Sequence, residues 1–425
     1  MSEADDLLAL SAPSEAETGL RSIGDALSEV VRRFAEYEAL GVIGIDASAF
    51  SEIERAFGGA ARFDAMLSLK VVVEELIGDR LGISDLILSG EIGRNEILVL
   101  LFRDLKETDF YNRELPDLHG ALAQGLKSCG SRIGYPHLEA PPKFLIGVAA
   151  SLRNPTIAAE SQIRYAVEQA HSDAALNERI GARRRRQKLF ELVLEGRVRS
   201  VYEPIVEVET RTVFGYEALA RGPEGSDLHS PAALFTSASE QDFLFQLDRL
   251  CRQSGLDGAR DFPGDAKLFL NIRPTTIYDP SFRSDKLRRT LDGCGLAPTD
   301  VVLEISEQES ISNFEIFREI RDYYGNLGFQ IAMDDVGAGY ASLEAVMELS
   351  PEFIKVDRAF VTGIDEDPPR QELLRALRSV SEQIGARIIG EGLDTLEELE
   401  TLRGLGIPFG QGWLFGKPHP LRTDT

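Results

Sequence analysis

The second half of the chain contains short apolar runs that end in polar or acidic residues. The clearest runs lie at residues 268–271, 301–304, 331–335, 353–357 and 387–391. Apolar residues at helical spacing lie between them, as in Ser312–Leu327 and Pro369–Ile384. Strands that alternate with helices from Val201 onward predict an α/β fold, a (β/α)8 barrel of the TIM type.

The first half of the chain has a separate α/β pattern. Strand-like segments occur at Val42–Ile45, Ile97–Phe102 and Phe144–Ala149, and an amphipathic helix is expected at Ala65–Leu76. The chain is therefore expected to have four parts. These are an acidic and helical lead at 1–36, an α/β domain at 37–177, a helical linker at 178–196 and a barrel domain at 197–425.

The composition excludes several classes of protein. A hydrophobic content of 43% and a charged content of 27% are typical of a soluble globular protein. The net charge of −24 argues against nucleic acids and anionic membranes as partners. We see no signal peptide and no long apolar run, so we expect a cytoplasmic protein without membrane insertion. Three separated cysteines and five scattered histidines argue against a disulfide framework or a histidine-based metal site.

Carboxylates and one amide lie where the predicted strands end. Glu217 follows an apolar stretch, and the strand ends carry Asn271, Glu304, Asp334 and Asp335. In a parallel barrel these ends meet at one mouth, where acids repel one another unless cations lie between them. Oxygen ligands of this kind suit Mg²⁺ or Mn²⁺, and a pair of such ions suits displacement at phosphorus.

Two later strands add further charge to the same rim. Lys355 contributes a positive charge and Glu391 another carboxylate. Any one of these residues could instead be a helix cap or a partner in a rim salt bridge. The whole set, at the ends of successive strands, favours a metal site.

Seven motifs in the second half occur in a fixed order. They are GYEALAR, FLNI, LEISE, DDVGAGYASL, EFIKVDRAF, IIGEGLDT and GQGWLFGKP. In this respect the chain resembles the EAL-domain family of cyclic di-GMP phosphodiesterases, over roughly residues 190–422. The three letters EAL alone are a weak signal, whereas seven ordered motifs at barrel spacing are a strong one.

The resemblance implies a role for each matching residue. Metal ligands are implied at Glu217, Asn271, Glu304, Asp334 and Asp335, for two ions of Mg²⁺ or Mn²⁺. Catalytic roles are implied for Lys355 near the attacking water, Glu391 as metal ligand or general base, and Glu307 as a brace for the loop after Asp335. Substrate contacts are implied for Glu203, Arg221 and Gln411. The implied reaction cleaves one phosphodiester of cyclic di-GMP and gives linear pGpG.

The chain departs from the family pattern at two places. Glu203 stands where the family has a glutamine that contacts the ligand. A carboxylate there would repel a phosphate, or it could accept hydrogen bonds from a guanine edge, and both interpretations stay open. The loop after the paired aspartates has Val336, Ala338 and Ala341 in place of the family residues, which removes two hydroxyls. The resemblance links this loop to dimerisation and to order at the metal site.

The first half resembles the GGDEF diguanylate cyclase domain more faintly, over about residues 37–177. Asp46 stands where that family has a metal-binding aspartate. The signature turn matches Gly93–Ile97, between two strand-like stretches, and its acidic Glu96 persists. The resemblance thus implies a nucleotidyl-cyclase-type α/β domain before the barrel.

This chain lacks several residues with which that family binds its nucleotide. Arg94 replaces the signature glycine that allows close approach to phosphates, and Asn95 replaces the acidic third residue. The positions that read guanine match Glu54 and Phe63, which do not preserve that chemistry. We therefore expect a degenerate domain with a regulatory or dimerising role, and residual GTP binding stays open.

The expected partners are cyclic di-GMP, a second copy of the chain through the EAL domain, and a regulatory protein that the sequence does not identify. The alternative to an active phosphodiesterase is a receptor that binds cyclic di-GMP with little or no turnover and signals through the linker helix. Trp413 follows the last strand, where we expect it in the core, although it could stack on a base.

Overall fold

The computed structural model describes residues 20–91, 93–138, 141–260, 262–307, 314–337 and 342–421. The chain forms two compact units, of which the first ends at Arg184 and the second begins at Arg185. Within the described ranges, no helix combines the length and the apolar character needed to cross a bilayer.

The first unit is built on a four-stranded antiparallel sheet with the order β2-β3-β1-β4. Its strands are β1 (Ala39–Asp46), β2 (Leu86–Ser89), β3 (Glu96–Arg103) and β4 (Leu145–Leu152). β1 and β3 contain the segments predicted from the sequence, and β4 begins one residue after the start of the third predicted segment. β2 is the strand-like stretch expected before the signature turn, although no bounds were predicted for it.

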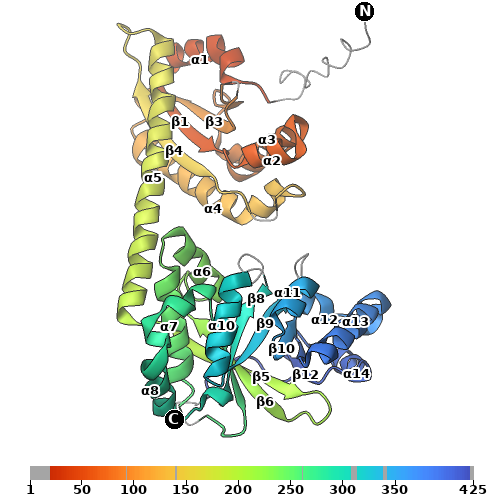
Figure 1. Cartoon of the computed structure of the whole chain (residues 1–425). Coiled ribbons are helices and arrows are strands. Elements are labelled where there is room, and N and C mark those ends of the chain that lie inside the picture. The colour runs from red at the N-terminus through yellow and green to blue at the C-terminus, as the bar shows by residue number, and fades with distance from the viewer. Residues whose placement is uncertain are drawn as a thin grey trace, which may run out of the picture. The chain divides into compact units, whose positions relative to one another are not determined.

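Helices cover both faces of this sheet (Figure 1). The elements are α1 (Ile23–Tyr37), α2 (Phe50–Phe57), α3 (Gly59–Ile77), η1 (Gly78–Arg80), η2 (Phe110–Glu114), α4 (Leu115–Gly134) and α5 (Ala159–Glu195). Alternate residues of the buried strands point to opposite faces. Ile97 and Val99 therefore pack with α2, α3 and α4, whereas Leu98 and Leu100 pack with α1 and α5.

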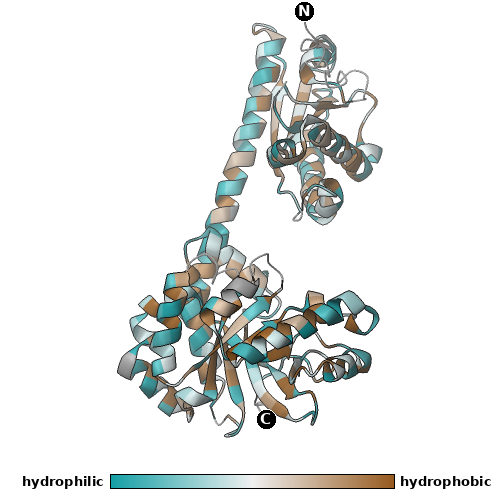
Figure 2. Cartoon of the chain, turned by 45° about the vertical axis from the view of Figure 1, so that its right-hand side comes forward, coloured by the Kyte–Doolittle hydropathy of each residue, from teal (hydrophilic) through white to brown (hydrophobic). Residues whose placement is uncertain are grey.

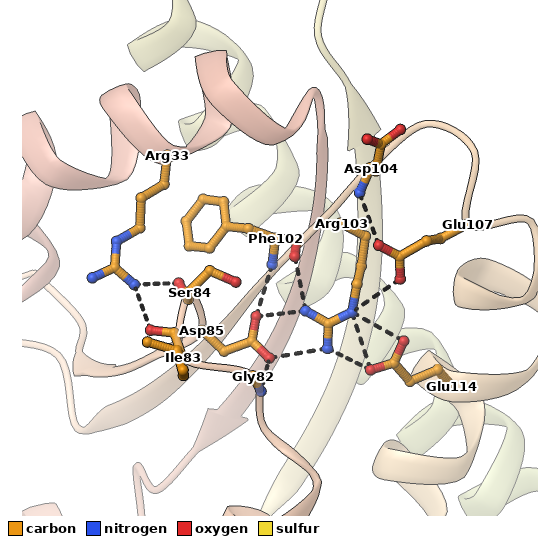
Figure 3. A network of polar contacts seen from close by, with 10 residues as sticks. All are labelled: Arg33, Gly82, Ile83, Ser84, Asp85, Phe102, Arg103, Asp104, Glu107 and Glu114. Atoms are coloured by element: carbon orange, nitrogen blue, oxygen red, sulfur yellow. Dashed lines mark hydrogen bonds and ion pairs between the residues drawn. The ribbon is translucent and has the colours of Figure 1, made fainter.

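A buried arginine fixes the end of β3 (Figure 3). Arg103 is 8% exposed, and its guanidinium lies 2.6 Å from Oδ1 of Asp85 and also pairs with Glu114. Asp85 in turn accepts hydrogen bonds from the backbone N–H groups of Gly82 and Phe102. Burial alone would lower the pKa of Arg103, but the bonds to Glu114 and Asp85 raise it above the ordinary value. The network joins β3 to the loop before β2 and to η2.

Helix α5 is one continuous element of 37 residues. Its first turns pack on the sheet through Ile163 and Ala166, and its last turns contribute Leu189 and Leu192 to a core in the second unit. The predicted boundaries at 177 and 196 fall within this helix or at its end. In Figure 2 hydrophilic and hydrophobic residues alternate along it.

The second unit is a closed barrel with the strand order β10-β11-β12-β5-β6-β7-β8-β9. The strands are β5 (Arg199–Glu207), β6 (Val213–Arg221), β7 (Lys267–Asn271), β8 (Val301–Ser306), β9 (Gln330–Val336), β10 (Phe353–Val356), β11 (Arg387–Gly390) and β12 (Phe409–Gln411). The predicted α/β barrel is confirmed. It departs from a regular (β/α)8 barrel because β5 runs antiparallel to both neighbours. A tight turn joins β5 to β6, and a hairpin of this kind reverses the chain.

Helices surround the barrel. They are α6 (Pro231–Glu240), α7 (Leu244–Asp257), η3 (Pro274–Tyr278), η4 (Pro280–Phe282), α8 (Ser284–Cys294), η5 (Pro298–Asp300), α10 (Phe314–Asn326), α11 (Ser342–Leu349), α12 (Arg358–Val361), η6 (Ile364–Glu366), α13 (Pro368–Ile384) and α14 (Leu396–Gly404). The main core of this unit includes Leu303 and Ile331 from the strands, and Phe317 and Leu374 from the helices. A second, smaller apolar cluster fills the barrel interior.

Candidate active site at the barrel mouth

The apolar layer inside the barrel sets the position of the polar layer above it. The inner apolar residues are Ile205, Phe269, Val302, Ala332, Phe353, Ile389 and Phe409. Side chains of a strand alternate between two faces, so the residue two positions further toward the mouth also points inward. These next inward residues are Glu203, Asn271, Glu304, Asp334, Lys355, Glu391 and Gln411. Because neighbouring strands place these polar residues at the same level of the barrel, their side chains form a ring at its mouth.

A bulge in β9 brings both adjacent aspartates to this ring. Ile354 pairs with Met333 and Val356 pairs with Val336, so β9 has one residue more than β10 over the same length. Asp335 has a φ of 59°, in the left-handed region that aspartate tolerates better than most residues. Carboxylate oxygens of Asp334, Asp335 and Glu391 consequently lie within 4.8 Å of one another.

Lys355 lies at the centre of the carboxylates and is 1% exposed. Its Nζ is 3.0 Å from Glu217, 3.0 Å from Glu304, 3.2 Å from Asp334 and 2.6 Å from Glu391. Burial alone would lower the pKa of Lys355, but the four carboxylates hold it well above its ordinary value. One ammonium group thus offsets part of a large buried negative charge.

Two amide side chains orient Glu217, which is 5% exposed. Nδ2 of Asn271 donates to Oε1 of Glu217 at 2.8 Å. Nε2 of Gln411 donates to Oε2 of Glu217 at 2.7 Å and to Oε2 of Glu203 at 3.0 Å. Burial would raise the pKa of Glu217, but Lys355 and these hydrogen bonds hold it below the ordinary value. Glu217 therefore remains a carboxylate.

The other acids have raised pKa values. Burial and the nearby Glu217 raise the pKa of Glu304 well above its ordinary range, and burial does the same for Glu391. Burial raises the pKa of Asp334, and desolvation together with Asp334 raises the pKa of Asp335 to about 6. In the absence of a cation these acids therefore hold a proton more readily than ordinary carboxyl groups do.

These donors fit a hard divalent cation. Oxygen atoms of Glu217, Glu304 and Asp334 lie within 4.8 Å of one another, and Asp334 also belongs to the group with Asp335 and Glu391. Oε2 of Glu304 is buried and accepts no hydrogen bond from the described residues, and the residue is 0% exposed. Buried carboxylate oxygens without donors are what Mg²⁺ or Mn²⁺ would satisfy. The predicted carboxylate ligands are thus close together, with Nζ of Lys355 among them, and Asn271 contacts Glu217.

Glu307 and Arg221 lie beside this centre. Glu307 is 1% exposed, and its Oε2 accepts a hydrogen bond from the backbone N–H of Gly337 at 3.1 Å. The loop positions predicted to influence the metal site, Ala338 and Ala341, lie outside the described residues. Arg221 ends β6, and its NH1 donates to the carbonyl oxygen of Ala220.

Two pockets open on either side of Glu217 and Asp334. One, of about 290 Å³, is also lined by Glu203, Asp335, Lys355, Arg358, Glu391, Asp394, Gln411 and Trp413. The other, of about 350 Å³, is lined by Phe235, Asp248, Leu270, Asn271, Arg273 and Ser306, among others. Sequence reasoning missed Arg358, Asp394, Asp248 and Arg273, although Arg358 and Arg273 each follow a strand end by two residues.

The expectation that Trp413 packs in the core is wrong. Trp413 is 60% exposed and lines the first pocket, and Nζ of Lys417 lies 4.5 Å from its ring centroid. Gly412, with a φ of 154°, turns the chain between Gln411 and Trp413, and a Cβ there would meet the backbone of Leu393 at 2.3 Å. The glycine that allows this turn also directs the tryptophan away from the core.

The residues of the predicted signature turn in the first unit contact other side chains. Asn95 accepts a hydrogen bond from Arg62 at 2.8 Å. Glu96 is 5% exposed, and its Oε2 lies 2.5 Å from Nε2 of His171 on α5, while Arg94 contacts the other ring nitrogen at 3.1 Å. Among the described residues, the acidic groups close enough to hold a metal lie in the barrel.

The barrel thus combines one antiparallel strand with parallel ones and carries a polar ring at its mouth. The model of the EAL domain matches residues 186–418. The chain belongs to the EAL domain family. The predicted resemblance over the second half is thereby confirmed, whereas the GGDEF resemblance of the first half stays a prediction.

Relatives of this EAL domain include two proteins of Escherichia coli. The protein named "Probable cyclic di-GMP phosphodiesterase PdeG" is 29% identical over 230 residues, which are 52% of this chain and 45% of that protein. The "Blue light- and temperature-regulated antirepressor BluF" is 26% identical over 217 residues, which are 51% of this chain and 53% of that protein. The matches cover between 28% and 53% of these and similar relatives.

Solved EAL domains share the fold. The FimX EAL domain of Xanthomonas citri, in a complex with c-diGMP, is 21% identical with a TM-score of 0.53. The match covers 60% of this chain and 99% of that domain. At this identity the comparison supports the barrel fold.

Proposed function

We propose that the EAL domain hydrolyses one phosphodiester bond of cyclic di-GMP to give linear pGpG, in a reaction that requires Mg²⁺ or Mn²⁺. The observation that carries this proposal is the pair of carboxylate groups that share Asp334 at the barrel mouth. Two cations held side by side are suited to displacement at phosphorus. The relative PdeG is named as a probable phosphodiesterase of this substrate.

The metal ligands in this proposal are Glu217, Asn271, Glu304, Asp334 and Asp335. Asp334 belongs to both carboxylate groups, so it could bind a cation held by either group. When bound, the ions would lower the pKa of a water molecule and stabilise the developing charge on the phosphate. Bound cations also explain how a chain with a net charge of −24 can accept a dianionic ligand.

Lys355 and Glu391 handle the attacking water in this proposal. Lys355 holds one carboxylate oxygen of Glu391 at 2.6 Å and so fixes its orientation. Burial raises the pKa of Glu391, which suits a group that takes a proton from water and later releases it. Glu307 holds the loop after Asp335 through the N–H of Gly337.

Substrate contacts are proposed for Glu203, Arg221 and Gln411. The two pockets flank Glu217 and Asp334, so a ligand with two halves could place one half in each while its scissile phosphate lies at the acids. Arg221 supplies a cation at the end of β6 for a phosphate.

The first unit has a regulatory or dimerising role in this proposal. Glu96 and Arg94, which match a cyclase signature turn, both contact His171 on α5. Side chains engaged in this way are less available for a nucleotide. We propose that the chain forms a homodimer through the EAL domain and that a separate regulatory protein acts on it.

The test is incubation of the full chain with cyclic di-GMP and Mg²⁺ or Mn²⁺, followed by chromatography for pGpG. Chelation by EDTA should abolish the product, and Glu217→Gln or Asp334→Asn should lower turnover by at least about 100-fold. Glu240→Gln, an exposed residue at the end of α6, is the matched control and should retain activity. Full activity in EDTA, or in either ligand variant, would contradict the proposal.

A receptor with little turnover is the second candidate. Two departures from the family pattern favour it. Glu203 changes the lining of the ligand pocket, and the altered residues around Val336 follow the proposed metal ligands Asp334 and Asp335. A receptor would bind cyclic di-GMP in calorimetry and yield no pGpG over the same period, whereas an enzyme would do both.

A further inference from the structure

Glu203 belongs to the polar ring but not to either carboxylate group. It is half-buried on β5. The two groups of acids whose oxygens lie within 4.8 Å of one another do not include it. One group is Glu217, Glu304 and Asp334, and the other is Asp334, Asp335 and Glu391. Glu203 forms no ion pair with any residue in the described part of the chain, whereas Lys355 pairs with four other acids. Its carboxylate is therefore left for something other than the metal centre.

Gln411 fixes Glu203 and adds a second acceptor. Its amide nitrogen is occupied by Glu203 and Glu217. Its Oε1 is buried and accepts no hydrogen bond from the described residues, and the whole residue is 4% exposed. This side of the pocket therefore presents hydrogen-bond acceptors, and a ligand that fits it must present donors.

An aromatic surface lies in the same pocket. Trp413 lines it together with Glu203 and is 60% exposed. The ammonium of Lys417 lies 4.5 Å from the ring centroid, so one face is engaged by a cation and the exposed area is available for stacking. A flat ligand with donors at its edge would satisfy both features.

We propose that Glu203 is the residue that selects guanine, by accepting hydrogen bonds from N1–H and N2–H of a base that stacks on Trp413. This inference rests on the proposed function, because it assumes a cyclic dinucleotide as the ligand. A carboxylate offers two parallel acceptors, which match the two adjacent donors of guanine. Adenine presents an acceptor at N1, which a carboxylate repels, so it is rejected.

The glutamate is better suited to this task than a glutamine. An amide side chain offers one acceptor and one donor, so it cannot accept from both donors of guanine. Gln411 already donates to Oε2 of Glu203, which keeps the carboxylate plane fixed while Oε1 and the second lone pair of Oε2 are left for the base. The site thus acquires base selectivity from a residue outside its metal centre.

The test compares the dissociation constants of cyclic di-GMP and cyclic di-AMP, measured by calorimetry on the full chain with Ca²⁺, a hard cation for the same oxygen ligands, in place of Mg²⁺. The wild type should prefer the guanine nucleotide, and Glu203→Gln should reduce that preference by at least about tenfold through weaker binding of cyclic di-GMP. Glu207→Gln makes the same change four residues along β5, next to Phe409 at the other end of the barrel, and should leave the preference intact.

Two outcomes would overturn the inference. One is a Glu203→Gln variant that binds cyclic di-GMP as tightly as the wild type or more tightly, because the natural carboxylate would then merely repel phosphate. The other is a wild type that does not discriminate between the bases. Hydrolysis is measured separately with Mg²⁺. A wild type that prefers the guanine nucleotide but forms no pGpG would contradict only the proposed function. A protein that forms pGpG, and whose base preference is unchanged by Glu203→Gln, would contradict only this inference.

Discussion

The ammonium group of Lys355 lies within 3.2 Å of four carboxylates in the interior of the barrel. The sequence places Lys355 at the rim of the barrel. In the structure its side chain is 1% exposed and supplies the positive charge that opposes the four carboxylates. Breaking a buried ion pair leaves uncompensated charge, which costs much more than losing a surface pair. Lys355 therefore has a structural role in addition to its proposed role near the attacking water.

Replacement of Lys355 by methionine should destabilise the metal-free protein by about 3–5 kcal/mol, because four acids lose their common partner. Mg²⁺ should recover part of this loss, so the difference in unfolding free energy between Mg²⁺ and EDTA should be larger in the variant than in the wild type. Denaturant unfolding measures both. Lys188→Met removes an exposed pair with Asp227 and should cost under about 1 kcal/mol. Equal Mg²⁺ effects in the variant and the wild type would contradict this expectation.

Asp335 should make metal binding depend on pH. Desolvation and Asp334 raise its pKa to about 6, so a proton competes with the cation below that pH. The affinity for Mn²⁺ should fall as the pH decreases from 7.5 through about 6, since the ligand must be deprotonated to bind. Calorimetric titrations across this range measure the effect, and Asp335→Asn should weaken binding and flatten the dependence near pH 6. An affinity that is constant between pH 5 and 7.5 would contradict the assignment.

At the scale of elements, irregularities place functional groups that regular strands could not. The bulge in β9 and the positive φ of Asp335 let two successive side chains serve one mouth, although a regular strand would point them in opposite directions. The antiparallel β5 carries Glu203 into the ring because it enters the barrel from the opposite direction. Both features arise from pairing between strands.

The arginine network of the first unit gives a prediction at the same scale. Asp85 joins Arg103 on β3 to the loop before β2, so Asp85→Ala should destabilise the protein by about 3–5 kcal/mol by leaving a buried guanidinium partly unpaired. Glu107 is a distant and exposed partner of the same arginine, 3.9 Å away, and Glu107→Gln should cost less than about 1 kcal/mol. Thermal unfolding followed by circular dichroism tests both variants, and similar losses in the two would refute the expectation.

Among the described residues each unit has hydrophobic clusters of its own, and helix α5 contributes to one cluster in each unit. Units with cores of their own can unfold in separate steps. The proposed metal site lies wholly within the barrel, so a bound cation stabilises that unit alone.

Differential scanning calorimetry should therefore resolve two transitions. Mg²⁺ should raise the midpoint of one of them by several degrees, and Asp85→Ala should lower the midpoint of the other. Asp334→Asn should remove the Mg²⁺ effect without changing the transition that responds to Asp85→Ala. A single transition that shifts with both changes would contradict two independent units.

The sequence by itself determined the barrel strands and most of the polar ring. Apolar runs can be recognised in the sequence because a barrel strand must bury its inward side chains. The residue two positions after an inward apolar one also points inward, which identifies Asn271, Glu304 and Gln411 as polar residues of the ring. The ordered motifs also indicated the EAL family, and the family model confirms this membership. These features follow from local chemistry along the chain.

The tertiary structure alone decided features that depend on contacts between distant segments. The reversed direction of β5, the central place of Lys355 and the contact between Glu96 and His171 each join residues far apart in the sequence. The exposure of Trp413 depends on a turn at Gly412 that packs closely against the backbone of Leu393. A sequence pattern records which residues prefer burial, whereas these arrangements depend on which strands pair and on which charges the interior must balance.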